Sequence, residues 1–99
     1  MRFYYVYILE CSDGSFYTGF TSDVDKRVMQ HNDGKVYTSY TYSRRPVKLV
    51  WVQEFSDPKQ AISFEKQVKG WRRKKKEALI NGDFNLLKEL SKPYNKNNK

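Results

Sequence analysis

Two apolar runs and the turn between them decide the fold: residues 2–20 read RFYYVYILECSDGSFYTGF. Aromatic and β-branched residues dominate 2–9, a composition typical of a strand that is covered on both faces. Asp13 and Gly14 lie between the two runs and predict a tight hairpin turn, because a primed turn needs positive φ angles. Residues 16–20 then form the return strand. Gly19 within it indicates either a bulge or a close approach of another group to the backbone.

The rest of the chain predicts helices around this hairpin. Ser22, with Asp25 three residues later, predicts a helix cap, and Asp57 followed by Pro58 predicts another. In chain order we expect a helix over about 23–31, a loop with a short helical turn over 35–46, a third strand over 47–55, a helix ending before Gly70, and short helices over about 72–80 and 84–90. The predicted class is therefore α+β, a three-stranded antiparallel sheet flanked by helices.

Length and composition allow one domain. The 99 residues can bury a single modest core, so we assign 1–90 to one domain and 91–99 to a flexible basic tail. No run approaches the roughly 20 apolar residues of a membrane span, and the first residues do not resemble a secretory signal. The single cysteine, Cys11, fits a reducing compartment, so we expect a cytoplasmic protein without membrane attachment.

The excess of positive charge lies in one half of the chain. The formal net charge is +8, with 8 basic and 7 acidic residues in 1–60 but 11 basic and 4 acidic residues in 61–99. This asymmetry favours a polyanionic partner, although a solvated face with a basic tail explains the same composition. The densest run holds Lys66, Lys69, Arg72, Arg73, Lys74, Lys75 and Lys76.

Trp71 lies inside this basic run and admits two interpretations. Its ring either stacks on a nucleic-acid base or anchors the short helix on the core. We predict a nucleic-acid-binding surface that contains Trp71, the seven cations of the run, and Lys35, Arg44 and Arg45 from the preceding loop. No residue pattern encodes readout of base edges, so recognition is predicted to rest on backbone and shape.

Glu65 is a carboxylate on the apolar face of a predicted helix. At about 100° per residue it falls within the arc that contains Ala61, Phe64 and Val68. A carboxylate in such a place is unfavourable unless it is paired, hydrogen-bonded or bound to a metal. Glu65 is therefore either a site residue or a rim carboxylate paired to a lysine.

Arg27 and His31 are four residues apart and share one face of the first predicted helix. Val24 and Val28 lie beside them, so both polar side chains border the core. His31 is the only histidine in the chain. It is either a surface residue at the end of the helix or part of a site with Arg27 and Glu65.

Tyr7 and Tyr17 lie on the two arms of the predicted hairpin. Pairing Asp13 with Gly14 pairs Tyr7 with Phe20, so the two tyrosines are predicted to lie diagonally rather than opposite each other. Each tyrosine taken alone also fits an ordinary core or cross-strand position.

Together these residues resemble the GIY-YIG nuclease superfamily, and most of all its small stand-alone bacterial members. The tripeptide YVY at 5–7 is followed by YTG at 17–19, by Arg27 ten residues further on, and then by His31 and a glutamate on a later helix, Glu65. The resemblance covers most of the chain. It implies hydrolysis of phosphodiester bonds with one divalent ion. We expect DNA to be the nucleic acid bound, with RNA as the alternative.

The resemblance also implies a role for each matched residue. Glu65 is expected to bind Mg²⁺ or Mn²⁺, because hard ions prefer carboxylate and water oxygens as ligands. An ion held by this one carboxylate would keep several waters. Tyr17 is expected to activate or position the attacking water, and Tyr7 to order that water or the scissile phosphate. Arg27 is expected to neutralise the developing charge with its planar fork of donors. His31 is expected to carry a proton or to orient a tyrosine.

Three features depart from the pattern of the family. Tyr5 replaces the glycine of the first motif, Phe20 stands where repair-type members have a lysine, and we expect no additional DNA-binding domain. Lys26, Lys35 and Arg44 are candidates for the missing cation. The sequence leaves three candidate functions: a structure-selective endonuclease that serves DNA repair, a nucleic-acid-binding module without turnover, or a domain whose basic half meets a protein. It does not indicate an oligomeric state.

Overall fold

The computed structural model describes residues 2–36 and 39–91. The predicted tail, 91–99, therefore lies outside the described residues except for Ser91. The elements are β1 (Tyr4–Glu10), β2 (Phe16–Thr21), α1 (Val24–Asn32), a 3₁₀ turn η1 (Tyr42–Arg44), β3 (Lys48–Phe55), α2 (Pro58–Lys69), α3 (Arg73–Ile80) and α4 (Phe84–Leu90). The predicted α+β class and every predicted element are confirmed, with boundaries that differ by one or two residues.

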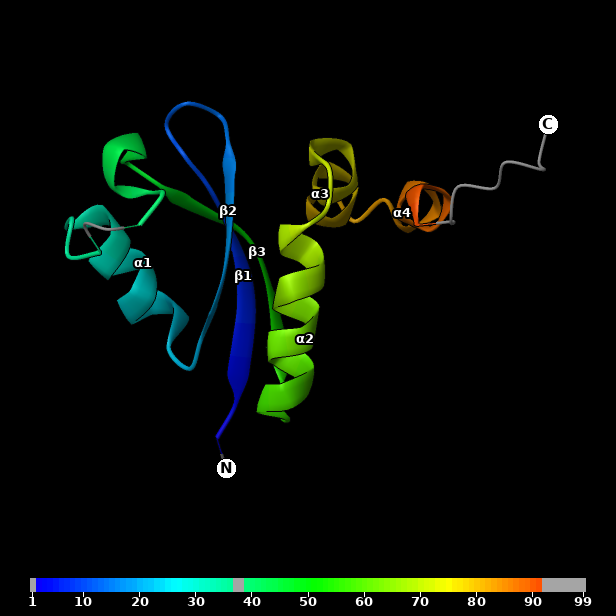
Figure 1. The fold of residues 1–99 in the computed structure, drawn as a ribbon, viewed down its shortest axis with the longest axis horizontal. Coiled ribbons are helices and arrows are strands. Elements are labelled where there is room, and N and C mark those ends of the chain that lie inside the picture. The colour runs from blue at the N-terminus through cyan, green and yellow to red at the C-terminus, as the bar shows by residue number, and fades with distance from the viewer. Residues whose placement is uncertain (1, 37–38, 92–99) are drawn as a thin grey trace.

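The sheet is antiparallel, and β1 lies at its centre in the order β2-β1-β3. Figure 1 shows α1 on one side of the sheet and α2, α3 and α4 on the other. Residues 6–9 of β1 are accordingly all buried, as predicted for a strand covered on both faces. Alternate side chains along β1 point to opposite faces, so this one strand contributes to two separate cores.

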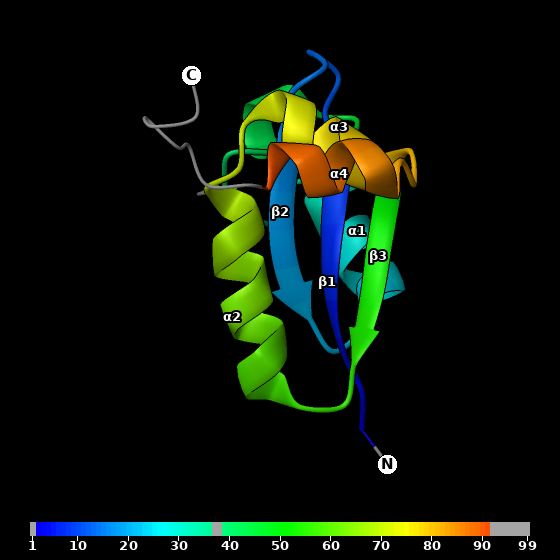
Figure 2. The same cartoon turned by 90° about the vertical axis from the view of Figure 1, so that its right-hand side faces the viewer.

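The two cores divide the sequence of β1 between them. Tyr7 and Leu9 pack with Cys11 and Val47, and Val28 of α1 packs against this cluster. On the other side Ile8 joins Val68 and Leu79, with Phe16, Val50, Trp51, Phe64, Trp71, Ile80 and Leu87 packed around them. Figure 2 shows α3 and α4 crossing one end of the sheet, while α2 runs beside β2.

The hairpin loop differs from the predicted primed turn. The N–H of Cys11 donates to the carbonyl of Ser15 at 2.8 Å, and the N–H of Gly14 donates to the carbonyl of Cys11 at 2.9 Å. Only Gly14 in the loop has a positive φ, of 84°. The Asp13 carboxylate accepts hydrogen bonds from the N–H and the hydroxyl of Ser15, at 3.0 and 2.6 Å. This side-chain turn stabilises a three-residue loop, 12–14, in place of a two-residue one.

The longer loop shifts the hairpin register by one residue. Tyr7 pairs with Gly19, and not with Phe20 as predicted. A shift of one residue moves every side chain of a strand to the other face of the sheet. The observed register therefore puts Tyr7 and Tyr17 on the same face, which the predicted register does not.

The helix caps are partly as predicted. The cap of α1 is Asp23, whose carboxylate accepts from the N–H of Lys26 at 3.1 Å, so the prediction of Ser22 is wrong by one residue. Asp57 caps α2 as predicted, with Pro58 in its first turn. Aspartate and serine are similarly good caps, so neighbouring candidates are not separated by residue type alone.

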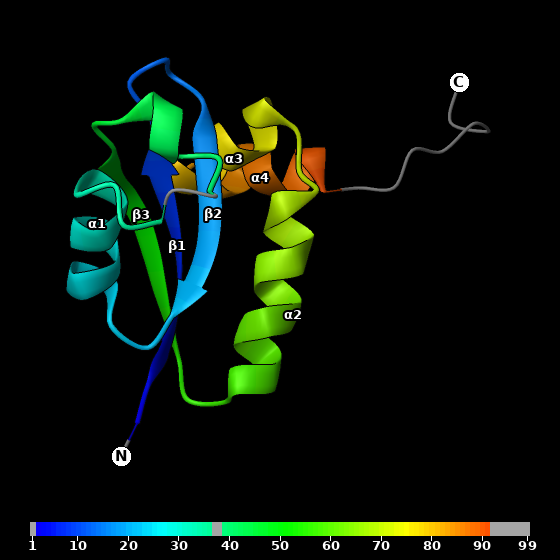
Figure 3. The same cartoon turned by 60° about the vertical axis from the view of Figure 1, so that its left-hand side comes forward.

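The packing of α2 brings a second helix to the β2 edge of the sheet. This helix packs against β2 and β1, and Figure 3 shows β2 between α1 and α2. Side chains from both helices can therefore meet at that edge. Within the part of the chain that the structure describes, no helix has both the length and the apolar character needed to cross a membrane.

Candidate active site

His31 is buried beneath the α1 side of the sheet, with only 1% of its surface exposed. The alternative of a surface residue at the helix end is therefore wrong. Its Nε2 lies 3.2 Å from the hydroxyl of Tyr7, and its Nδ1 lies 2.6 Å from Oγ1 of Thr41. Tyr7 and Thr41 are themselves 1% and 0% exposed. The three side chains form a hydrogen-bond chain sealed from solvent.

The direction of this chain follows from its far end. The hydroxyl of Thr41 donates to Oγ of Ser39 at 3.2 Å. With the Thr41 hydroxyl in this orientation, Oγ1 accepts from His31, and we assign the imidazole proton to Nδ1. Nε2 is left as an acceptor, and it receives the hydrogen bond of the Tyr7 hydroxyl.

Burial sets the charge state of both ring systems. It lowers the pKa of His31 to about 4, and the positive charge of Arg27 acts in the same direction. It raises the pKa of Tyr7 to about 12 against the opposing effect of Arg27, while Tyr17 and Glu65 add to the rise. Near pH 7 the histidine is thus neutral and the tyrosine keeps its proton.

Gly19 of the YTG tripeptide makes room for Tyr7. A Cβ at Gly19 would overlap the hydroxyl and Cζ of the Tyr7 ring. The pairing of β1 with β2 is continuous through Gly19, so of the two predicted explanations the close approach is confirmed and the bulge is not. The glycine of this motif is required by the tyrosine of the other motif.

Tyr17 completes a cluster of three rings. Its ring centroid is 5.2 Å from that of His31 and 6.4 Å from that of Tyr7. Tyr17 is half-buried, and it stands on β2 at the edge of the sheet. It is therefore the ring of the cluster that a ligand can reach.

Arg27 and Glu65 approach the cluster from the two helices. Nη1 of Arg27 donates to Oε1 of Gln30 at 3.2 Å, and its charge acts on both Tyr7 and His31. Glu65 acts electrostatically on Tyr7 from α2. The structure thus brings together all five residues that the sequence predicts as catalytic.

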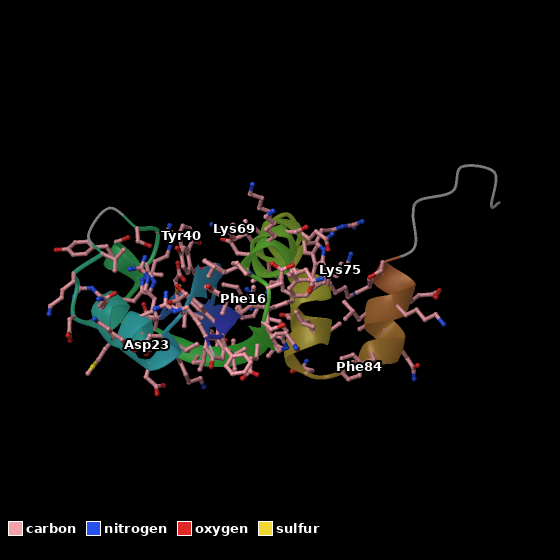
Figure 4. All side chains as sticks on the ribbon, turned by 90° about the horizontal axis from the view of Figure 1, so that it is seen from below. Phe16, Asp23, Tyr40, Lys69, Lys75 and Phe84 are labelled. Atoms are coloured by element: carbon pink, nitrogen blue, oxygen red, sulfur yellow. The ribbon has the colours of Figure 1, made fainter. Side chains whose placement is uncertain are left out.

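Lys69 also belongs to this cluster. Its Nζ lies 2.8 Å from Oε2 of Glu65 and 5.9 Å from the centroid of the Tyr17 ring. Figure 4 looks along the strands and shows Lys69, with Tyr40, on the β2 side of the molecule. Lys69 is the lysine that the alternative interpretation of Glu65 requires, but the pair lies at the site rather than away from it.

A model of the GIY-YIG catalytic domain matches residues 3–78. The chain belongs to the GIY-YIG family. This family includes nucleases, and its domains typically act on nucleic acids. The observed cluster contains both motif tyrosines, Tyr7 and Tyr17, and the motif glycine, Gly19.

Relatives within the family are UPF0213 proteins. One from Bacillus pumilus is 41% identical over 93 residues, which cover 94% of this chain and 93% of the relative. One from Halalkalibacterium halodurans is 48% identical over 77 residues, covering 78% of this chain and 81% of the relative. These names state a family and no activity.

Two solution structures have the same fold. That of a UPF0213 protein from Bacillus halodurans is 47% identical, with a TM-score of 0.53 over 80% of this chain and 83% of that one. That of a protein from E. faecalis is 31% identical, with a TM-score of 0.57 over 96% of this chain and 95% of that one. The comparisons therefore support the fold along most of the chain.

The donor set of this GIY-YIG domain fits one hard divalent ion. Glu65 is the carboxylate of the cluster, and residues 2–36 and 39–91 hold no group of three or more His, Cys, Asp or Glu side chains that could bind a metal. A site with a single carboxylate suits Mg²⁺ or Mn²⁺, which bind through one or two carboxylates, substrate phosphate and water. It does not suit zinc, which requires more nitrogen or sulfur ligands.

A polar pocket of about 500 Å³ opens beside Arg27. Residues 20–23, from the end of β2 to the cap of α1, line it together with Lys26, Arg27 and Gln30. Lys26 was a candidate for the cation that Phe20 does not supply, and the two side chains share this pocket. Tyr5, the other departure from the family pattern, lines a different pocket with Leu49 and Val52.

Several side chains of the predicted nucleic-acid-binding surface are engaged in contacts within the protein. Trp71 packs against Phe64, with ring centroids 6.1 Å apart, and Nζ of Lys75 lies 4.2 Å from the centroid of the Trp71 ring. Arg73 is bonded to Glu77 at 2.9 Å and to the carbonyl of Gly14 at 2.6 Å. The half-buried Trp71 ring packs against the core and carries a lysine on one face, which favours the anchoring interpretation. Its place in the binding surface stays a prediction.

Arg44 and Arg45 of the loop make contacts within the protein and do not project freely into solvent. Nε of Arg44 pairs with Asp13 at 3.1 Å, and its guanidinium lies 3.8 Å from the centroid of the Tyr40 ring. Arg45 donates to the carbonyl of Tyr42 at 2.8 Å. Four other predicted cations are exposed and have no ion-pair partner among the residues that can be described: Lys35, Lys66, Arg72 and Lys74.

Sequence reasoning missed Thr41 as a site residue and did not recognise the role of Lys69. Thr41 lies just before η1, in a segment without periodicity, so nothing in its spacing indicates a contact with His31. For Lys69 a signal was present, since residues four apart on a helix are neighbours.

Proposed function

We propose that this domain hydrolyses phosphodiester bonds in DNA with one Mg²⁺ or Mn²⁺ ion. The observation that carries the proposal is the buried chain from Thr41 through His31 to Tyr7, with Arg27 beside it. A chain of buried polar groups serves to hold one hydroxyl in one orientation. Membership of a family that includes nucleases supports the same conclusion.

Arg27 supplies the positive charge that phosphoryl transfer requires. The oxygens of the reacting phosphate gain charge in the transition state, and a guanidinium offers two parallel donors to them. Arg27 lines the polar pocket of about 500 Å³. A phosphate bound at that pocket lies within reach of Arg27 and Lys26 together.

The two tyrosines have different tasks in this proposal. Tyr17 orients the attacking water, whose oxygen bonds to phosphorus as the bond to the leaving sugar oxygen breaks. Solvent accepts the proton that the water loses and supplies one to the leaving sugar oxygen. Tyr7, with a pKa of about 12, stays protonated, and its hydroxyl donates a hydrogen bond to Nε2 of His31. Its oxygen then accepts a hydrogen bond from the water or from Arg27.

His31 orients Tyr7 and does not act as a proton carrier at neutral pH. Its pKa of about 4 keeps the imidazole neutral, with its proton on Nδ1 and with Nε2 available as an acceptor. Of the two roles that the family resemblance implies for His31, the orienting one is the role that we adopt.

Glu65 would hold the divalent ion through its carboxylate. When bound, the ion supplies Lewis-acid charge to the phosphate. The side chain of Glu65 is 13% exposed, so it reaches the β2 edge with little freedom. A second candidate function, nucleic-acid binding without turnover, is favoured by the ion pair with Lys69, which already neutralises this carboxylate.

Cleavage of a labelled panel of single strand, duplex, flap and four-way junction in Mg²⁺ or Mn²⁺ tests the proposal. We expect metal-dependent cutting by the wild type and none by Glu65→Ala. Glu54→Ala is the matched control, since Glu54 is an exposed carboxylate on β3 at the other edge of the sheet. It should cut like the wild type.

Two results contradict the proposal in different ways. Equal cutting by Glu65→Ala and the wild type would remove Glu65 as the metal ligand. Binding of the panel without any cutting would assign the domain to the second candidate function. A preference for the flap or the junction over the duplex would support structure-selective recognition.

A further inference from the structure

Glu65 and Lys69 form an ion pair whose two members differ in burial. They lie one helical turn apart on α2, with Nζ and Oε2 2.8 Å from each other. The carboxylate side chain is 13% exposed and the lysine side chain 51%. The ammonium can therefore leave for solvent, whereas the carboxylate is held against the site.

This pair is not an ordinary surface pair of a helix. Nζ of Lys69 lies 5.9 Å from the centroid of the Tyr17 ring, and Glu65 acts on Tyr7. Both tyrosines belong to the ring cluster around His31. A pair on the solvated face of a helix would lie near neither of them.

Resting on the proposed function, we propose that Lys69 is an exchangeable cation of the site. In the metal-free protein it occupies the carboxylate of Glu65. A divalent ion that binds Glu65 displaces the ammonium, and the displaced ammonium then binds a phosphate oxygen of the nucleic acid next to Tyr17.

The chemistry of the exchange is simple. An ammonium and a divalent ion both bind carboxylate oxygens, and they repel each other when they are neighbours. Lysine carries its charge on a flexible stem of four carbons, so the ammonium moves by side-chain rotation alone. No bond is formed or broken, and no further reactant is needed.

The exchange also supplies the cation that the second motif lacks. Phe20 follows the YTG tripeptide, and its ring stacks on that of Tyr4 with centroids 6.0 Å apart. Lys69 reaches the neighbourhood of Tyr17 from α2 instead. A phosphate next to Tyr17 would thus meet a lysine only when the ion is present.

The first test measures Mn²⁺ affinity by calorimetry in the absence of nucleic acid. Lys69→Met keeps the length of the side chain and its helix propensity, and it removes the competing charge. We expect it to bind Mn²⁺ about three- to tenfold more tightly than the wild type. Lys66→Met, which removes an unpaired charge from the same helix, should change the affinity by less than about twofold.

The outcomes separate this inference from the proposed function. If Lys69→Met binds Mn²⁺ no more tightly than Lys66→Met does, the exchange is wrong. If Glu65→Gln keeps the affinity of the wild type, the ion binds elsewhere and the metal assignment itself fails. Lys69→Gln, compared by thermal unfolding and by the same titration, guards against a fold defect that is specific to methionine.

The second test measures affinity for a short duplex with and without Ca²⁺, which leaves turnover out of the measurement. Lys69→Met should weaken binding about three- to tenfold in Ca²⁺ and less than about twofold without it, because Lys69 is then held by Glu65. Lys66→Met should weaken binding equally in both conditions. Equal weakening by Lys69→Met in both conditions would make Lys69 a permanent phosphate contact and overturn the exchange.

Discussion

The two sides of the site are built by opposite means. On the α1 side Tyr7, His31 and Thr41 are buried, neutral and linked by hydrogen bonds. On the α2 side Glu65 and Lys69 are charged, and the lysine is half-exposed. The first side is preorganised before any ligand arrives, and the second can change its partners. A change of pH should therefore affect the buried side most, and a change of salt or metal ion should affect the charged side most.

On the buried side Arg27 offers the largest effect, because its positive charge acts on both Tyr7 and His31. Arg27→Ala should reduce metal-dependent cleavage about 10²- to 10³-fold, as for loss of one charge-stabilising group. Arg27→Lys keeps the positive charge and loses the planar set of guanidinium donors. Its cleavage rate should lie between the rates of Arg27→Ala and the wild type. Single-turnover rates measure both, and equal rates for all three proteins would exclude Arg27 from the reaction.

The second largest effect is expected from acid, which should lower the stability of the fold through the buried His31. The pKa of His31 falls from its usual 6.5 to about 4 on folding, so the unfolded chain binds the proton more readily. The stability that depends on this group is complete above about pH 6.5 and declines as the pH falls towards 4.

The decline should reach about 3 kcal/mol at pH 4, from the size of the pKa shift. Urea unfolding of the wild type and of His31→Gln between pH 7 and pH 4 measures it, since the variant lacks the titrating group. Parallel pH profiles for the two proteins would show that His31 is not buried in its neutral form.

Thr41→Val should have an intermediate effect. It removes the acceptor of the Nδ1 proton and leaves that donor buried, so the loss of stability should be about 1–3 kcal/mol. The imidazole should shift towards the Nε2–H tautomer, which ¹⁵N NMR detects. Thr41→Ser should restore the Nδ1–H form. An unchanged tautomer in Thr41→Val would mean that Thr41 does not orient His31.

The smallest effect is expected on the charged side. Lys69→Gln should change the free energy of unfolding by less than about 1 kcal/mol, because the ammonium is half-exposed and a glutamine amide can still donate to the carboxylate of Glu65. The same variant should respond less to added salt than the wild type. Thermal unfolding at low and high salt measures both, and a loss of several kcal/mol would place Lys69 in the packing of α2.

The sequence predicted the fold well, and the five residues selected by their motif spacing lie near one another in the structure, because that spacing follows the motifs of a known family. It failed where a single side chain selects between close alternatives. The carboxylate of Asp13 lengthens the hairpin loop by one residue, and this moves Tyr17 to the face of Tyr7. Trp71 could not be assigned without the packing of Phe64. Thr41 lies in a segment whose apolar residues follow no helix or strand spacing, so its position could not be predicted.

Tyr7 serves two purposes, since it belongs both to a core and to the site. Over evolutionary time, selection for a stable fold alone should preserve Tyr7, together with His31 and Gly19, which fit around it. Glu65 and Arg27 contribute less to packing, so only selection for chemistry should preserve them. Among proteins of this fold, these two positions are therefore the better markers of a lineage that has kept its activity.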